Sequence, residues 1–220
     1  MKRVLLLLLI VAVGVTVVYV ITPPEEKKPL PIINPIDLDT SVVDPELLRM
    51  GYGHTIGDFS FPDQNGHVIT RKDVEGKVCV AEYFFTTCQS ICPLMNREMK
   101  RVHNAFKNND NVAILSFTVD PQTDTVAQMK RYASHLQADS RQWHFLTGEK
   151  EKLYSLARKS FFVLKPAETA NQGDAGSDFI HTNNFVLVDQ NLRIRGYYDG
   201  TSQKEVTQLI LDIRRLLDEK

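Results

Sequence analysis

The sequence predicts an α/β domain, with a mixed central sheet flanked by helices, behind an apolar N-terminal segment. Three observations support this fold class. Strand-like and helix-like segments alternate from residue 77 onward, which is typical of βαβ units. The runs KVCVAEYFF (77–85) and NVAILSFTV (111–119) have the length and composition of strands buried on both faces. Finally, no charged residue occurs between Val4 and Pro24, which defines the apolar segment before the domain.

The overall charge excludes one class of function. The chain has 220 residues, with 26 Lys and Arg against 27 Asp and Glu, and a net charge of -1. Such a chain has no strong positive field to hold a polyanion, so we expect no nucleic-acid partner. Its three cysteines are too few for a disulfide-stapled miniprotein, and any sulfur chemistry must be local.

The N-terminal part divides into two segments. Residues 1–22 contain an apolar run long enough to cross a bilayer, and they predict a single transmembrane signal anchor. Lys2 and Arg3 precede the run, so the positive-inside rule places the remainder across the membrane. We therefore expect a single-pass protein of the cytoplasmic (inner) membrane, with its domain facing the periplasm or extracytoplasmic side. A cleaved signal peptide is the alternative.

Residues 23–49 follow as a predicted stalk. Half of the ten prolines lie in TPPEEKKPLPIINP (22–35), a composition that favours an extended chain. The folded domain is predicted to cover residues 50–220.

The domain is predicted to begin with a β-hairpin and to continue with alternating elements. FSFPDQNGHVIT (59–70) places apolar residues on both sides of an Asn65-Gly66 turn. After the first buried strand, Pro93 suits the start of a helix, whose buried stripe consists of Met95, Met99, Val102 and Phe106. The remaining elements are a strand at 111–119, a helix at 125–135, a strand at 143–146, a helix at 149–161, strands at 181–189 and 192–198, and a helix at 203–217.

Two cysteines are the strongest candidates for chemistry. Cys88 and Cys92 are four residues apart in CQSICP, between a buried strand and the start of a helix. Free N–H groups and the helix dipole stabilise a thiolate there, which favours both metal binding and thiol–disulfide exchange. The third cysteine, Cys79, lies inside a strand, and we expect it to be packing.

A metal site needs at least one further ligand, and His181 is the best placed of the six histidines. It follows the polar segment 165–178 and opens a strand, at the type of position where α/β sites collect. Two thiolates and one imidazole form a soft site that favours Cu(I) and tolerates Cu(II). Zinc is the main competitor, although a structural zinc site usually has four protein ligands. Met95 could be a thioether ligand, but its place on the helix stripe predicts packing.

Two acidic residues follow the next strand. Asp120 precedes Pro121. It is predicted either to form a turn or to position the metal ligands without binding the metal itself. Asp124 is predicted to cap the following helix.

Together, the CQSICP loop, the run TVDPQTDT (118–125), the histidine of FIHTNNFVLVD (179–189) and the anchor resemble the Sco/SenC family of thioredoxin-like, membrane-tethered copper proteins. The resemblance covers about residues 50 to 220. It implies a thioredoxin-like fold with copper, Cu(I) or Cu(II), on Cys88, Cys92 and His181, and it matches Asp120 to the acidic position of the family's VDP motif.

The resemblance also implies a function, the delivery of copper to the dinuclear copper centre of cytochrome c oxidase. The partners would be the copper-centre subunit of the oxidase and a copper donor or thiol reductant. The alternative is a thiol-disulfide oxidoreductase that reduces the cysteines of that subunit, with Cys88 attacking and Cys92 resolving the mixed disulfide. Whether the protein is an enzyme stays open between these two functions.

Overall fold

The computed structural model describes residues 13–14, 28–38, 43, 45–49, 51–163 and 183–219. The predicted membrane anchor falls almost entirely outside these residues. Within the described ranges, no helix has the length and apolar character needed to span a membrane.

A five-stranded mixed sheet forms the centre of the domain, in the order β5-β4-β3-β6-β7. Strands β3 (Val78–Phe84), β4 (Val112–Thr118) and β5 (Trp143–Leu146) are parallel. Strands β6 (Asn184–Val188) and β7 (Ile194–Asp199) complete the sheet with antiparallel pairings. All seven residues of β3 and of β4 are buried, as their apolar sequences predict.

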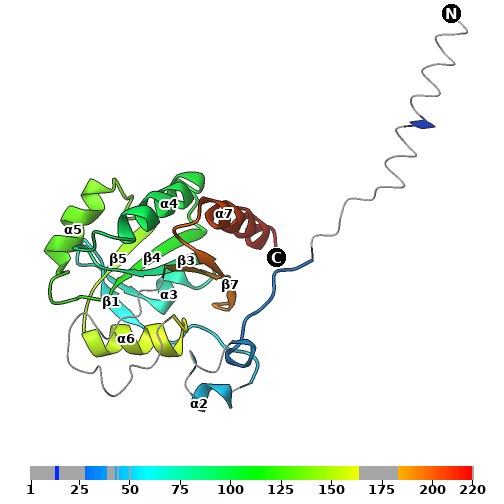
Figure 1. Cartoon of the computed structure of the whole chain (residues 1–220), viewed down its shortest axis with the longest axis horizontal. Coiled ribbons are helices and arrows are strands. Elements are labelled where there is room, and N and C mark those ends of the chain that lie inside the picture. The colour runs from blue at the N-terminus through cyan, green and yellow to red at the C-terminus, as the bar shows by residue number, and fades with distance from the viewer. Residues whose placement is uncertain are drawn as a thin grey trace, which may run out of the picture.

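Helices cover both faces of this sheet (Figure 1). On one face, α4 (Cys92–Ala105), α5 (Val126–His135) and α7 (Gln203–Asp218) contribute Met99, Met129 and Leu209 to a buried apolar cluster. On the other, α3 (Arg71–Val74) and α6 (Lys150–Lys159) pack through Val74 and Leu156. The predicted α/β architecture, with helices flanking a mixed sheet, is confirmed.

The predicted N-terminal hairpin is also confirmed. Strands β1 (Ser60–Pro62) and β2 (Val68–Thr70) pair antiparallel, with Phe61 opposite Ile69. The turn contains Gly66 at a φ of 79°, a conformation that glycine adopts readily. The Asp63 carboxylate accepts hydrogen bonds from the N–H groups of Asn65 and His67 and so stabilises the turn.

The described part of the predicted stalk lies against the domain. Residues 28–38 contact β7 at Ile194 and Arg195 and include the short helix η1 (Pro35–Asp37), and helix α2 (Pro45–Leu48) follows. The N–H of Ile33 donates to the carbonyl of Ile194, and Val43 is 1% exposed within the core. The sequence suggested a segment separate from the domain, whereas these residues are packed on it. The apolar side chains Ile33 and Val43, set among prolines, are the physical reason.

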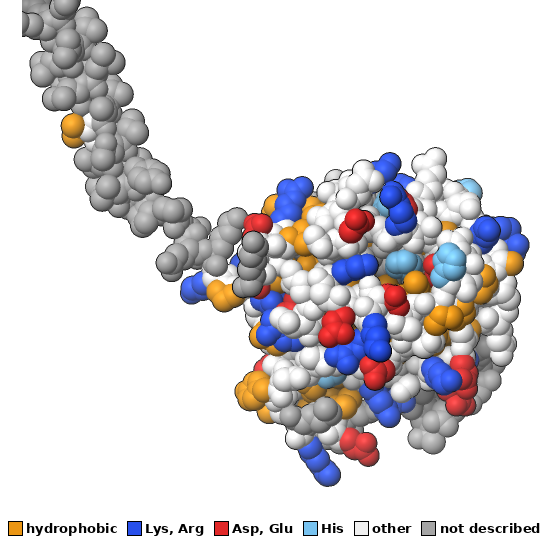
Figure 2. Space-filling model, turned by 180° about the vertical axis from the view of Figure 1, so that it is seen from behind, with side chains coloured by type: hydrophobic (Ala, Val, Ile, Leu, Met, Phe, Trp, Pro, Cys, Tyr) orange, Lys and Arg blue, Asp and Glu red, His pale blue; other side chains and the backbone are white. Residues whose placement is uncertain are grey.

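The surface carries charges of both signs. On the face shown in Figure 2, Lys and Arg side chains are interspersed with Asp and Glu side chains. Among the described residues of that face there is no extended patch of one sign.

Candidate metal centre

Cys88 and Cys92 lie where β3 ends and α4 begins, so the fold places them at the carboxyl end of the parallel strands. Cys92 is the first residue of α4, and Pro93 follows it in the first turn. Cys88 is partly exposed and Cys92 is 3% exposed, and both are free thiols. The loop therefore presents one sulfur to solvent and holds the other in the core.

The two thiols differ in acidity because their surroundings differ. Partial burial raises the pKa of Cys88, but hydrogen bonds from the Cys92 thiol and N–H, and from Ser90, outweigh it and lower the pKa to about 7. Burial raises the pKa of Cys92, and its hydrogen bond to Cys88 raises it further. Cys88 is therefore the first of the two thiols to ionise, close to neutral pH, and its thiolate accepts a hydrogen bond from a protonated Cys92.

Soft donors of this kind suit copper. Thiolates are the protein ligands that favour Cu(I), and a pKa of about 7 leaves Cys88 partly deprotonated near neutral pH. Among the described residues, no group of three or more His, Cys, Asp or Glu side chains could hold a metal ion. The predicted third ligand, His181, falls outside the described residues. The pair thus supplies two donors, and the full ligand set stays a prediction.

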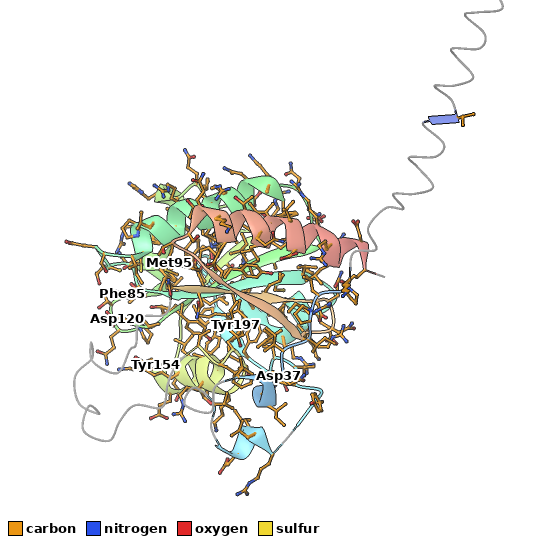
Figure 3. The ribbon with its side chains drawn as sticks, turned by 45° about the vertical axis from the view of Figure 1, so that its right-hand side comes forward. Asp37, Phe85, Met95, Asp120, Tyr154 and Tyr197 are labelled. Atoms are coloured by element: carbon orange, nitrogen blue, oxygen red, sulfur yellow. The ribbon has the colours of Figure 1, made fainter. Side chains whose placement is uncertain are left out.

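Asp120 lies at the same end of the sheet as the cysteine loop, at the carboxyl ends of the parallel strands. The N–H of Val119 donates to the carbonyl of Phe84, which aligns the ends of β3 and β4. Figure 3 shows Phe85, Asp120 and Met95 at this end of the molecule. The Asp120 N–H donates to Thr118 Oγ1 and its carbonyl accepts from the Asp124 N–H. These bonds form the predicted turn, and a supporting role toward the ligands stays a prediction.

Asp124 has a different role from the predicted helix cap. The side chain that caps α5 is that of Thr125, whose Oγ1 accepts from the N–H of Gln128 at 3.3 Å. Asp124 is 1% exposed, and its carboxylate accepts from the N–H and hydroxyl of Thr86 and, at 2.5 Å, from the hydroxyl of Thr118. The cap prediction is wrong because the chain turns inward at Asp124 and leaves the capping position to the next residue. Asp124 instead ties the start of the cysteine loop to the end of β4.

Sequence reasoning also missed Glu82, a carboxyl buried in β3 that contributes to the raised pKa of Cys92. It is 1% exposed, and its Oε1 accepts from Ser116 Oγ at 2.6 Å. Ser116 Oγ in turn accepts from Trp143 Nε1 at 2.8 Å. Among the described residues, Oε2 has no hydrogen-bond partner, and burial raises the pKa of Glu82 to about 7. A charged residue inside the apolar run KVCVAEYFF was the signal that could have revealed it.

Met95 and Cys79 are packing residues, as predicted. Met95 is 1% exposed within the apolar cluster on the α4 face of the sheet. Cys79 is 2% exposed in the opposite cluster, and burial raises its pKa to about 12. Neither side chain is open to solvent for metal binding.

Comparison with known sequences gives a family match over most of the chain. The model of the SCO1/SenC family matches residues 50–218. The SCO1 protein homolog of Bacillus subtilis strain 168 is 30% identical over 163 residues, which cover 73% of this chain and 82% of the relative.

Solved structures agree with this match. A SCO1/SenC family lipoprotein from Bacillus anthracis has a TM-score of 0.64 at 30% identity, over 74% of this chain and 95% of its own. BsSco, described with a disulfide switch as a member of the Sco family of cytochrome c oxidase assembly proteins, has a TM-score of 0.64 at 29% identity, over 76% and 95%. Bradyrhizobium japonicum ScoI with copper bound has a TM-score of 0.59 at 25% identity, over 74% and 99%. With its sheet, its cysteine loop and these matches, the chain belongs to the SCO1/SenC family.

Proposed function

We propose that this protein is a membrane-tethered copper-binding protein that delivers copper to the dinuclear copper centre of cytochrome c oxidase. The observation that carries the proposal is the cysteine pair at the start of α4, with one sulfur partly exposed and the other buried. The relatives named above, one with copper bound and one from an oxidase assembly family, support the same function.

In this proposal Cys88, Cys92 and His181 bind the copper, and Asp120 helps to position these ligands without binding the copper itself. Cys92 is protonated in the free protein, so we expect copper binding to release a proton from it. Partial exposure of Cys88 lets an acceptor ligand approach the ion from solvent, so that one ligand at a time can be exchanged. Copper is the cargo, supplied by a donor protein and passed to the copper-centre subunit of the oxidase.

The proposed location is the cytoplasmic membrane. Residues 1–22 would form the single membrane span and residues 23–27 the part of the connection that precedes the packed segment. The domain would then face the periplasm.

The test is copper binding by the reduced full chain in detergent, native and with His181→Ala. We expect one equivalent of Cu(I) in competition with a chelator and a thiolate-to-Cu(II) charge-transfer band. Loss of an imidazole should weaken Cu(II) binding more than Cu(I) binding, because Cu(I) prefers the two thiolates. His67→Ala is the matched control, since His67 is exposed on the hairpin. Binding that is weak and unaffected by His181→Ala would contradict the proposal.

A second function, thiol–disulfide exchange, is favoured by the unequal acidity of the two cysteines. A Cys88 thiolate would attack a disulfide of the oxidase subunit and release one of its sulfurs as a thiolate. Cys92 would then attack Cys88 of the mixed disulfide, releasing the second substrate thiol and leaving a Cys88–Cys92 disulfide. A thiol reductant would restore the pair. This activity should survive His181→Ala, which distinguishes it from copper delivery.

A further inference from the structure

The N-terminal segment is fixed to the domain by a buried arginine. Arg195 in β7 is 4% exposed, and it donates to the carbonyl of Leu30 at 2.6 Å and to that of Pro31 at 3.0 Å. The same guanidinium pairs with Asp189 at 2.9 Å and with Glu219 at 3.0 Å. Because an arginine this deeply buried needs all its partners, the attachment of the segment is part of the folded structure.

Helix α7 adds a second set of contacts at the same place. The guanidinium of Arg215, near the end of α7, donates to the carbonyl of Lys28. The Leu30 N–H donates to Glu219 at 3.5 Å. The chain is thus held from Lys28 onward, the first residue described after the predicted anchor.

This attachment lies at the end of the sheet opposite the cysteine loop. Strand β7 runs in the same direction as β3, since both are antiparallel to β6. Ile194, which pairs with Ile33, is opposite Val188, and Val188 is opposite Cys79 near the start of β3. From Cys79 to Phe84 the strand advances about 17 Å before the cysteine loop begins. Figure 3 shows the same separation, with Phe85 and Asp120 on one side and the N-terminal segment joining on the other.

The connection to the predicted membrane span is short. The span is predicted to end at residue 22, and the chain is held by the domain from Lys28. Six residues of fully extended chain reach at most about 20 Å. The end of the sheet where the segment is attached therefore has to stay near the lipid headgroups.

We infer that the attachment by Arg195, Arg215 and Glu219 orients the anchored domain, with the start of β3 toward a lipid surface and the cysteine loop away from it. The end of the molecule near residues 108–111 is then the surface that meets the membrane. The cysteine loop is presented to a partner whose receiving site stands outside the bilayer. This inference rests on the membrane anchor of the proposed function.

The experiment is depth-dependent quenching of a fluorophore on the full chain reconstituted in vesicles. With Cys88 and Cys92 replaced by serine, a single cysteine is introduced by Ser90→Cys in the cysteine loop or by Asp110→Cys before β4. Both positions are exposed, and Cys79 is buried. With a quencher on the lipid headgroups, we expect the probe at 110 to be quenched several-fold more strongly than the probe at 90.

Two further variants test the cause of the orientation. A flexible Gly-Ser insertion between Lys27 and Lys28 that doubles the connection should reduce the difference between the probes, and it leaves the described contacts intact. Arg215→Gln with Glu219→Gln loosens the attachment at partly exposed positions, and it should also reduce the difference.

Several outcomes would overturn the inference. These are equal quenching at the two positions, stronger quenching at 90, or a difference that survives the longer connection. A chain that does not float with the vesicles would also overturn the inference, because it would show that the chain is not anchored in the membrane. The quenching experiment uses no copper, so a failure of the copper-binding test would not change its result. Equal quenching, in turn, would say nothing against Cys88, Cys92 and His181 as the copper ligands.

Discussion

Cys88 owes its acidity to neighbours that are only two and four residues away in the chain. Partial burial opposes ionisation, and hydrogen bonds from Cys92 and Ser90 overcome it, to give a pKa of about 7. The Sγ of Cys88 lies 3.6 Å from Ser90 Oγ. The acidity is therefore local to the loop.

We expect the rate of iodoacetamide reaction at Cys88 in the reduced, metal-free protein to rise with pH around a midpoint near 7, because the thiolate is the reacting form. Cys92 should stay unmodified in the folded protein. Ser90→Ala removes a hydrogen bond to the thiolate and should move the midpoint upward, whereas Gln89→Ala, at an exposed neighbour, should not. The sites are identified by mass spectrometry. A midpoint near the ordinary value of 9 would contradict this account of the loop.

Glu82 links stability to pH. Burial raises its pKa from 4.5 to about 7, so between these values the folded state holds more protons than the unfolded state. The stabilisation from this group is complete below about 4.5 and is lost as the pH rises through about 7. The difference corresponds to about 3 kcal/mol at most.

Glu82→Gln should flatten this part of the pH dependence, because an amide keeps an acceptor for Ser116 and does not ionise. Urea denaturation at pH 5 and pH 8 measures the change. We expect the free energy of unfolding of the native protein to fall over this interval by more than that of the variant. Parallel pH profiles for the two proteins would show that Glu82 is not the group involved.

At the scale of elements, Asp124 connects the loop after β3 with the end of β4. Its carboxylate accepts from Thr86 and Thr118, and Gln128 of α5 donates to the Thr86 hydroxyl at 3.1 Å. The loop after β3 and the end of β4 meet at this buried carboxylate, and α5 joins them through the Thr86 hydroxyl. The start of the cysteine loop is therefore set by the packing of β4 and α5.

Asp124→Ala would leave the Thr86 N–H and two hydroxyls without an acceptor, and we expect it to lower the free energy of unfolding by roughly 2–4 kcal/mol. Asp124→Asn keeps one acceptor oxygen and should cost less. Thr125→Ala removes only the helix cap and should cost about 1 kcal/mol. Chemical denaturation of the three variants gives the order. Equal losses for Asp124→Ala and Thr125→Ala would mean that Asp124 contributes no more than a cap.

At the scale of the whole molecule, the segment before residue 50 belongs to the folded unit. Asn34 is 5% exposed, and its side-chain oxygen accepts from the N–H groups of Gly53 and His54. Val43 packs in the core, and Arg195 depends on carbonyls of the segment. A chain that begins at residue 50 lacks these partners.

We therefore expect a chain of residues 50–220 to be less stable than one of residues 28–220. The loss should be on the order of 2–4 kcal/mol, because several buried polar groups lose their partners. Urea denaturation of the two chains checks it, with circular dichroism to show that both are folded. Equal stability would mean that the contacts of residues 28–43 contribute nothing to folding.

The sequence determined the order of the elements, the two buried strands, the hairpin and the cysteine loop at the start of a helix. These follow from local patterns: apolar runs such as VCVAEYF, the Asn65-Gly66 turn and a proline after Cys92. The family resemblance came from short motifs, each of them local, and from their order along the chain. Local chemistry was therefore enough to indicate a thiol site and the fold around it.

Only the tertiary structure decided which residues meet. Asp124 reaches Thr86 across 38 positions, and Arg195 reaches Leu30 across 165. Glu82 stands out in the sequence only as a charge within an apolar run, and it is the packing of the domain that removes its carboxyl from water. Such contacts depend on strand order and on the direction of β7, which no short stretch of sequence encodes. The acidity of Cys88 is set within the cysteine loop, whereas the support and the orientation of that loop come from residues that folding brings together.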